Sequence, residues 1–399
     1  MTDAILLLLL GAFALAVPLT LYARAMGNRL NALDGAGVAG QVKEAARRVP
    51  NTGGVAVFGA VTLPLIAFLL ALRFGMDGRL VSIFPSLAPH LERVKDQSGT
   101  YGWLLICLGV LHVMGLIDDR RPLGAWPKLL VMLGVAAAFV LFTGDNSRIL
   151  TLLDARVGGP WLSILITVVW IVAVTNAMNF IDNMDGLCGG VSAVAGACFM
   201  VSALIHHQWF VAGVLALLVG GCLGFLLFNF PLRKPATIFL GDGGSLVVGF
   251  ILAVMAVRIT YARIDGVPAD SGRWHAVLTP LVVLAVPLYD MLSVTFLRLR
   301  QGKSPFVGDL QHLSHRLHFG GIAGPGSAQS GLTRRDTVLV ICGLTAITAM
   351  GGVVLPSLQP WQAAVVFAQT VAALALLGIW EYRAAGAAKA RSDAVGGGR

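Results

Sequence analysis

A short stretch at the end of one apolar run, NAMNFIDNMDGL (residues 176–187), is rich in side chains that can do chemistry. An amide or a carboxylate recurs there at every third position, at Asn176, Asn179, Asp182 and Asp185. Amide and carboxylate oxygens are hard ligands that suit Mg²⁺ or Mn²⁺, ions that also bind substrate phosphates. A carboxylate held in hydrocarbon costs roughly 2.5 to 3.5 kcal/mol, so Asp182 and Asp185 beside a membrane helix indicate a function. If the helix continues, alternate members of the set share a face, although Asn183 and Gly186 favour a break.

Two adjacent carboxylates form a second group, in GLIDDRRPLGAWPK, where Asp118 and Asp119 precede Lys128. Side by side, the two carboxylates repel each other unless a cation or a proton lies between them. The pair therefore suits metal binding or proton abstraction. The alternative interpretation is a solvated loop capped by charges.

Asp242 is the one carboxylate in GDGGS (residues 241–245), directly before another apolar run. Aspartate is a common N-cap residue, so the stretch predicts the start of a helix. Glycines also allow a phosphate to approach the backbone at a helix N-terminus. The sequence leaves both interpretations open.

A long polar connection, GKSPFVGDLQHLSHRL (residues 302–317), holds a fourth group, which consists of Asp309, His312, His315 and Arg316. A spacing of three on a short helix would put the first three of these on one face, where they could hold a phosphate or a nucleotide. A zinc site is disfavoured because the cysteines lie elsewhere and no H-E-x-x-H pattern exists. Asp290, inside the preceding apolar run, is either a helper of the site or the partner of an arginine.

The composition identifies the elements that must position these groups. Of the 399 residues, 57% are hydrophobic and 12% are charged, and the mean hydropathy is +0.81, whereas an ordinary soluble domain has about 25% charged residues. The chain is therefore expected to be one integral membrane domain, residues 1–399. The net charge of +9 is scattered over short loops, so nucleic acid is not an expected partner. The five single cysteines favour neither disulfides nor zinc.

Eleven apolar stretches are long enough to cross a bilayer about 30 Å thick as helices, which predicts an all-α polytopic membrane protein. They lie near residues 4–22, 52–72, 101–117, 127–143, 160–178, 189–205, 209–229, 243–258, 275–297, 336–355 and 361–380. The first stretch has neither a basic n-region nor a clear cleavage site, so it is expected to remain as an uncleaved span.

Alternate connections between these stretches differ in their lysine and arginine content. One set holds 20 of the 29 basic residues, so the positive-inside rule places it in the cytoplasm, with the N-terminus outside and the short basic tail, residues 381–399, inside. All the polar groups above belong to this set. That asymmetry favours an enzyme of the inner (plasma) membrane, with a cytoplasmic active site within residues 47–317. A transporter of a polar or anionic solute would need polar groups near the midplane and on both sides.

Together and in this order, the groups resemble the motifs of the polyprenyl-phosphate N-acetylhexosamine-1-phosphate transferase family, over about residues 47–317. The family patterns G-x-I-D-D, N-x-x-N-x-x-D-G-x-D-G and F-N-x-P…F-x-G-D-x-G-S match GLIDD, NAMNFIDNMDG and FNFPLRKPATIFLGDGGS, and PNTGG matches a Pro-x-x-Gly-Gly element. The chain departs from these patterns at three places. Asn183 stands where glycine is commoner, and Ser314 replaces the middle histidine of H-x-H-H-R-L. A histidine upstream of PNTGG is absent, with Arg47 and Arg48 in its neighbourhood.

The resemblance implies an enzyme that moves a sugar 1-phosphate from a UDP-N-acetylhexosamine to polyprenyl phosphate and releases UMP, at the start of cell-envelope glycan synthesis. Eleven spans resemble the glycosyltransferase family 4 branch that initiates lipid-linked N-acetylhexosamines more than the ten-span muramyl-pentapeptide branch. The cofactor implied is Mg²⁺, with Mn²⁺ as an alternative, and the implied metal ligands are Asn179 and Asp242.

The resemblance also implies roles for the remaining residues. Asp118 or Asp119 would take the proton of the lipid phosphate beside Lys128, and Asp182 and Asp185 would complete the polar wall of the site. Donor binding is expected from Arg47, Arg48, Asp309, His312, His315 and Arg316. The oligomeric state stays open, with a homodimer as one option.

Overall fold

The computed structural model describes residues 1–34, 47–144, 147–149, 154, 158–259, 274–304, 310–320 and 331–396. Apart from one isolated bridge between Leu33 and Pro50, these residues contain no β-structure. The first helices are α1 (Thr2–Arg29), α2 (Gly54–Arg73), α3 (Asp77–Ile83), η1 (Pro85–His90), α4 (Leu91–Asp96), α5 (Ser98–Arg120), α6 (Ala125–Thr143), α8 (Trp161–Phe180) and α9 (Leu187–Ile205). They are followed by α10 (Trp209–Asn229), α11 (Asp242–Arg258), η4 (Trp274–Leu278), α12 (Thr279–Val283), α13 (Ala285–Arg300), α14 (Leu313–Phe319), α15 (Arg334–Val354), η5 (Leu355–Ser357) and α16 (Pro360–Gly396).

The helices have the lengths that a membrane protein needs. Nine helices of the described chain are long and apolar enough to cross a bilayer, and a bent pair, α12 with α13, makes a tenth candidate. All eleven apolar stretches of the sequence fall on helices, including α11, whose 17 residues would extend about 26 Å. The prediction of an all-α polytopic membrane protein is confirmed.

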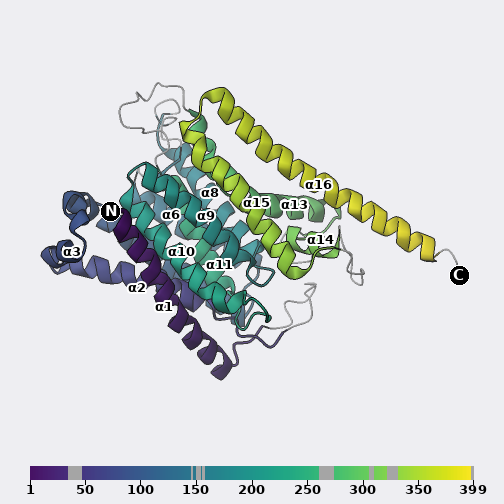
Figure 1. Ribbon diagram of the computed structural model, residues 1–399, viewed down its shortest axis with the longest axis horizontal. Helices are drawn as coiled ribbons and strands as arrows, with labels where there is room; N and C mark the ends of the chain where they lie inside the picture. The colour runs from purple at the N-terminus through teal and green to yellow at the C-terminus, as the bar shows by residue number, and fades with distance from the viewer. Residues whose placement is uncertain are drawn as a thin grey trace.

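The centre of the bundle is formed by α10 and α11, and α1 lies alongside α10 (Figure 1). Residues 243–256 of α11 are all buried. Small residues let the helices approach closely: a Cβ added at Gly224 of α10 would lie 2.7 Å from both the Cβ of Ala16 and the carbonyl oxygen of Phe13. Such contacts between small residues are the usual way for helices to associate within a membrane, where burial of apolar surface drives little.

The first turn of α11 is packed between the backbones of two other helices. A Cβ added at Gly115 of α5 would lie 2.5 Å from the Cα of Gly243, and one added at Gly244 would lie 2.8 Å from the Cα of Gly54 in α2. Each of these glycines is needed for space. Their packing fixes the start of α11 against α2 and α5.

A methyl group at Gly115 should therefore loosen this junction. We expect Gly115→Ala to cost about 1 to 3 kcal/mol of stability, the range for overpacking a filled interior, and to lower the unfolding temperature of the detergent-solubilised protein. The matched control is Gly109→Ala in the same helix, where an added Cβ meets nothing within 4 Å. Equal unfolding temperatures for the two variants would contradict the packing argument.

The ninth predicted span, residues 275–297, is not one straight helix. Two helices, α12 and α13, meet at Leu284 with a bend of 71°. Pro287 explains the break, because it has no N–H to donate to the carbonyl group four residues earlier and its ring clashes with that turn. The bend directs α13 and its Asp290 along a different axis from α12.

Candidate active site

The polar residues of the sequence motifs meet where four helices begin or end. The C-terminal ends of α5 and α8 lie beside the N-terminal ends of α6 and α11 and the segment before α2. Hydrogen bonds or electrostatic contacts connect six of the predicted site residues there: Asp118, Asp119, Lys128, Asn179, Asp182 and Asp242. Residues separated by more than 100 positions in the sequence thus form one cluster.

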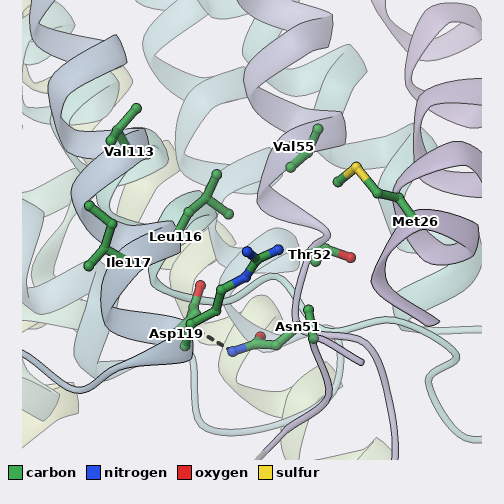
Figure 2. A pocket seen from close by; sticks show the side chains of 10 residues that line it. Met26, Asn51, Thr52, Val55, Val113, Leu116, Ile117 and Asp119 are labelled. Atoms are coloured by element: carbon green, nitrogen blue, oxygen red, sulfur yellow. Dashed lines mark hydrogen bonds between the residues drawn. The ribbon is translucent and has the colours of Figure 1, made fainter. Parts of the chain in front are cut away.

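Asp119, at the end of α5, holds the start of α11 in place. Its carboxylate accepts hydrogen bonds from the backbone N–H groups of Asp242 at 3.0 Å and Gly243 at 3.2 Å, and from the side-chain amide of Asn51 at 2.7 Å. Figure 2 shows the contact between Asn51 and Asp119. A negative group is favourable at a helix N-terminus because the free N–H groups and the helix dipole attract it.

This arrangement decides between the two interpretations of GDGGS. Gly241 has a φ of +72°, Asp242 begins the helix, and the next two glycines are covered by neighbouring backbone. In the structure the N-terminal N–H groups face the carboxylate of Asp119. The stretch therefore serves as a helix start with close packing, and the N–H groups of Asp242 and Gly243 do not form an open phosphate cradle.

Lys128, in the first turn of α6, lies between two carboxylates. Its ammonium group donates to Asp118 at 3.0 Å and also to Asp242. The side chains of these three residues retain 15–24% exposure, so the cluster is only partly closed to solvent. Asp118 in addition accepts the backbone N–H of Leu123 at 2.8 Å, which fixes the turn that leads to α6.

Asn179, in the last turn of α8, contacts the other side of Asp242. Its amide nitrogen donates to a carboxylate oxygen of Asp242 and to the hydroxyl of Ser245, both at 2.9 Å. Asn176, one turn earlier, is directed elsewhere and contacts the sulfur of Met291 at 3.8 Å. The helix ends at Phe180, so the spacing of three does not continue along one face.

The segment after α8 carries the two remaining acidic residues of that motif. Burial raises the pKa of the Asp182 carboxyl well above its usual range, and the charges of Asp242 and Asp119 raise this pKa further. Asp185 instead pairs with Arg47 at 2.7 Å and accepts the backbone N–H of Ala236 at 3.1 Å. Asp182 thus belongs to the cluster. Asp185 instead joins the segment after α8 to Arg47 and Ala236.

The cluster has the donor chemistry for a divalent cation. The cluster holds four acidic residues and one lysine, Lys128. The acidic residues are Asp118, Asp119, Asp182 and Asp242. No three His, Cys, Asp or Glu side chains of the described chain form a ready-made metal cage, but Mg²⁺ usually binds one or two carboxylates and keeps waters and substrate phosphates as its other ligands. Ligation by Asn179 would require its amide to turn and present the oxygen.

The histidine motif forms a separate structure beside the cluster. His312 directly precedes α14 and its ring contacts Asp290 at 2.8 Å, while Asp290 also accepts the backbone N–H of Leu313 at the start of that helix. Arg316 is 1% exposed and donates to the carbonyl oxygen of Gln311 and to the hydroxyl of Ser293. Asp290 is therefore an anchor for α14.

His315, on the same helix, is also buried. Burial and the neighbouring His312 lower the pKa of His315 to about 4, so this imidazole is neutral at pH 7. Arg48 is exposed, and Asp309 lies outside the described residues. The donor-binding roles of these residues stay predictions.

Two amide residues that the sequence reasoning did not assign help to build the site. Asn51 contacts Asp119, as described above, and Asn229 at the end of α10 accepts the backbone N–H of Gly186 at 2.8 Å and donates to the carbonyl oxygen of Ile238 at 2.9 Å. Both lie within motifs of the sequence, PNTGG and FNFP. The sequence did contain a signal that could have identified these two residues, namely a polar amide at the border of an apolar helix.

A pocket of about 220 Å³ opens next to Asp119. Figure 2 shows apolar side chains of α1, α2 and α5 around it, among them Met26, Val55 and Ile117. Asn51 and Asp119 lie at its polar end. The pocket thus joins an apolar wall to the acidic cluster.

Known proteins with similar sequences share the part of the chain that forms this cluster. The profile described as "Glycosyl transferase family 4" matches residues 101–260, which contain the whole acidic cluster. A probable undecaprenyl-phosphate N-acetylglucosaminyl 1-phosphate transferase of Bacillus subtilis is 29% identical over 78% of this chain and 75% of its own length. The decaprenyl-phosphate N-acetylglucosaminephosphotransferase of Mycobacterium tuberculosis is 35% identical over 71% and 70%. A phospho-N-acetylmuramoyl-pentapeptide-transferase of Lactococcus lactis is 30% identical over 55% and 64%. By these matches the chain belongs to glycosyl transferase family 4, the polyprenyl-phosphate N-acetylhexosamine-1-phosphate transferases.

Proposed function

We propose that the protein transfers N-acetylglucosamine 1-phosphate, or a closely related N-acetylhexosamine 1-phosphate, from its UDP-sugar to polyprenyl phosphate. The products are a polyprenyl-diphosphate sugar and UMP. The relatives that share most of this chain's length are named for N-acetylglucosaminyl 1-phosphate transfer to undecaprenyl or decaprenyl phosphate. The observation that carries the proposal is the junction at Asp242, where Lys128, Asn179 and Asp119 converge at a helix start.

The reaction needs an oxygen of the lipid phosphate to attack the β-phosphorus of the donor. The bond from the β-phosphorus to the bridging oxygen breaks, and this oxygen leaves with UMP. Such transfers depend on positioning and charge stabilisation more than on covalent chemistry by the protein. An ammonium group and several hard oxygens fixed by helix ends supply these two requirements.

The contacts of the adjacent carboxylates favour different roles for them. Asp119 accepts three hydrogen bonds from protein groups. Asp118 is paired with Lys128 and remains partly exposed. We therefore assign Asp118 to the proton of the lipid phosphate and Asp119 to the placement of α11.

Asp242 and Asn179 would hold Mg²⁺, and the bound ion would neutralise negative charge on the donor diphosphate. Asp182 lies close enough to interact electrostatically with Asp242, and a bound cation would favour its ionised form, so its carboxylate would add to the affinity of the site for that cation. We further propose that the site faces the cytoplasm, on the strength of the basic residues in its loops.

The decisive experiment mixes the detergent-purified protein with polyprenyl phosphate, Mg²⁺ and a panel of UDP-sugars, and measures UMP. We expect release only when the lipid phosphate is present, with a UDP-N-acetylhexosamine as the best donor. Absence of UMP with every donor would refute the proposal. Release that does not depend on the lipid would refute the assigned acceptor.

The separate roles of the two carboxylates can be tested by Asp118→Asn and Asp119→Asn. Loss of a general base typically lowers kcat by about 10² to 10⁴-fold, and we expect this for Asp118→Asn with an unfolding temperature near that of the wild type. Asp119→Asn should lower the unfolding temperature, because the amide group has one acceptor oxygen where the carboxylate has two. A fully active Asp118→Asn variant would contradict the assignment.

A further inference from the structure

Two of the residues at which the motifs of this chain depart from the family patterns, Asn183 and Ser314, are in contact. The hydroxyl of Ser314, in α14, donates a hydrogen bond to the side-chain oxygen of Asn183, in the segment that follows α8. The amide nitrogen of Asn183 in turn donates to the carbonyl oxygen of Phe180 at 2.8 Å. Residues 131 positions apart are thereby joined by their side chains.

A second contact joins the same two elements. The ring of Phe180 packs edge-on against the ring of His312 at 5.7 Å between centroids. His312 directly precedes α14 and Ser314 lies in its first turn, whereas Phe180 is the last residue of α8 and Asn183 lies three residues beyond it. Two points of attachment fix the direction of α14 relative to α8, which a single contact would not.

The position of this junction connects it to the reaction. Asn179 and Asp182, on one side of it, belong to the acidic cluster. His315, on the other side, follows Ser314 directly. A displacement of α14 would therefore change the distance between the cluster and the histidine helix without altering either one internally.

We propose that Ser314 and Asn183 act as one positioning pair, which holds α14 at the distance from the acidic cluster that binds the nucleotide-sugar donor. This inference rests on the proposed function. It assigns the pair to placement of the donor site and not to contact with the reacting atoms.

Available space makes the two positions interdependent. Ser314 is 1% exposed, so a larger side chain there must displace its neighbour, the Asn183 amide. Asn183 does not have a positive φ, so its backbone does not require glycine. A glycine at 183 would instead vacate the space that an imidazole at 314 needs, and overpacking of a filled interior without that space is destabilising.

The test is a double-mutant cycle of Ser314→His, Asn183→Gly and the double variant, all assayed for UMP release. Contacting residues give non-additive effects. We expect Ser314→His alone to lower kcat/KM by at least about tenfold, and the double variant to return to within about threefold of the wild type. If the double variant shows the product of the two single losses, the pairing is wrong.

A second variant, Ser314→Ala, covers the case in which Ser314→His does not fold. It should raise KM for the UDP-sugar by about five- to tenfold and leave kcat and KM for the lipid within about twofold, because a lost hydrogen bond affects only donor placement. Equal increases in the two KM values, or no change in either, would overturn the proposal. The matched control is Ser192→Ala, a buried serine bonded only to Cys188 of its own helix in the contacts described, which should leave both KM values unchanged.

The outcomes separate this inference from the proposed function. A wild-type protein that releases no UMP refutes the function, and the donor-positioning role with it. An active wild type with additive variants refutes the pairing alone.

Discussion

Asp242→Asn is expected to reduce transfer of sugar phosphate to polyprenyl phosphate to background. The side chain keeps its shape in this variant, and the backbone N–H that donates to Asp119 is retained. Only the charge that faces Lys128 and Asn179 is lost. Removal of one preorganised charge-stabilising group typically costs about 10² to 10³-fold in kcat, and loss of the cation site adds to this.

Two measurements check this prediction. UMP release under saturating lipid and donor gives kcat, and electron paramagnetic resonance of added Mn²⁺ gives the affinity of the cation site. The control is Asp77→Asn, which removes a carboxylate that pairs with Lys95 far from the site along the chain and should change neither quantity. Undiminished turnover by Asp242→Asn would refute the metal assignment.

Lys128→Met should affect stability and activity together. The ammonium group bridges Asp118 and Asp242, and its removal leaves the carboxylates of the cluster without their lysine. Removing one partner of a buried ion pair costs about 3 to 5 kcal/mol of stability. We expect a loss of about 3 kcal/mol here, because the side chains are partly exposed. Transfer should fall by about 10²-fold or more, because the proposed site loses the lysine that would stabilise phosphate charge.

The physical reason can be checked with a second substitution. Adding Asp118→Asn to Lys128→Met removes one of the uncompensated charges, so the double variant should regain part of the lost unfolding temperature but none of the activity. Lys95→Met removes a lysine that is more exposed than Lys128 and pairs with Glu92 and Asp77; it is the matched control and should have little effect on either stability or activity. A double variant less stable than Lys128→Met would contradict the electrostatic explanation.

The membrane-spanning helices could be predicted from the sequence because the length of an apolar run is enough to identify them. A run such as residues 209–229 is long enough to cross a bilayer and has no alternative to a helix there, since every backbone group must be bonded internally. Its predicted bounds coincide with those of α10. The bend before α13 was missed, because the effect of Pro287 depends on neighbours that can hold a broken helix.

The members of the acidic cluster could be recognised from residue type, but not their partners. Nothing in the sequence separates Asp118 from Asp119, although in the structure Asp118 pairs with Lys128 and Asp119 contacts the N-terminus of α11. The motif likewise predicts Asp185 in the polar wall of the site, yet it pairs with Arg47. These assignments depend on tertiary contacts between residues far apart in the sequence.

The junction of Asn51, Asp119 and Asp242 has a consequence for biogenesis. A nascent chain that has inserted α1 to α10 carries Asn51 and Asp119, but it has no helix start for them to hold. The proposed active site can thus form only after α11 leaves the ribosome and integrates. Premature termination before residue 242 would yield fragments that reside in the bilayer without consuming the cell's pool of carrier lipid.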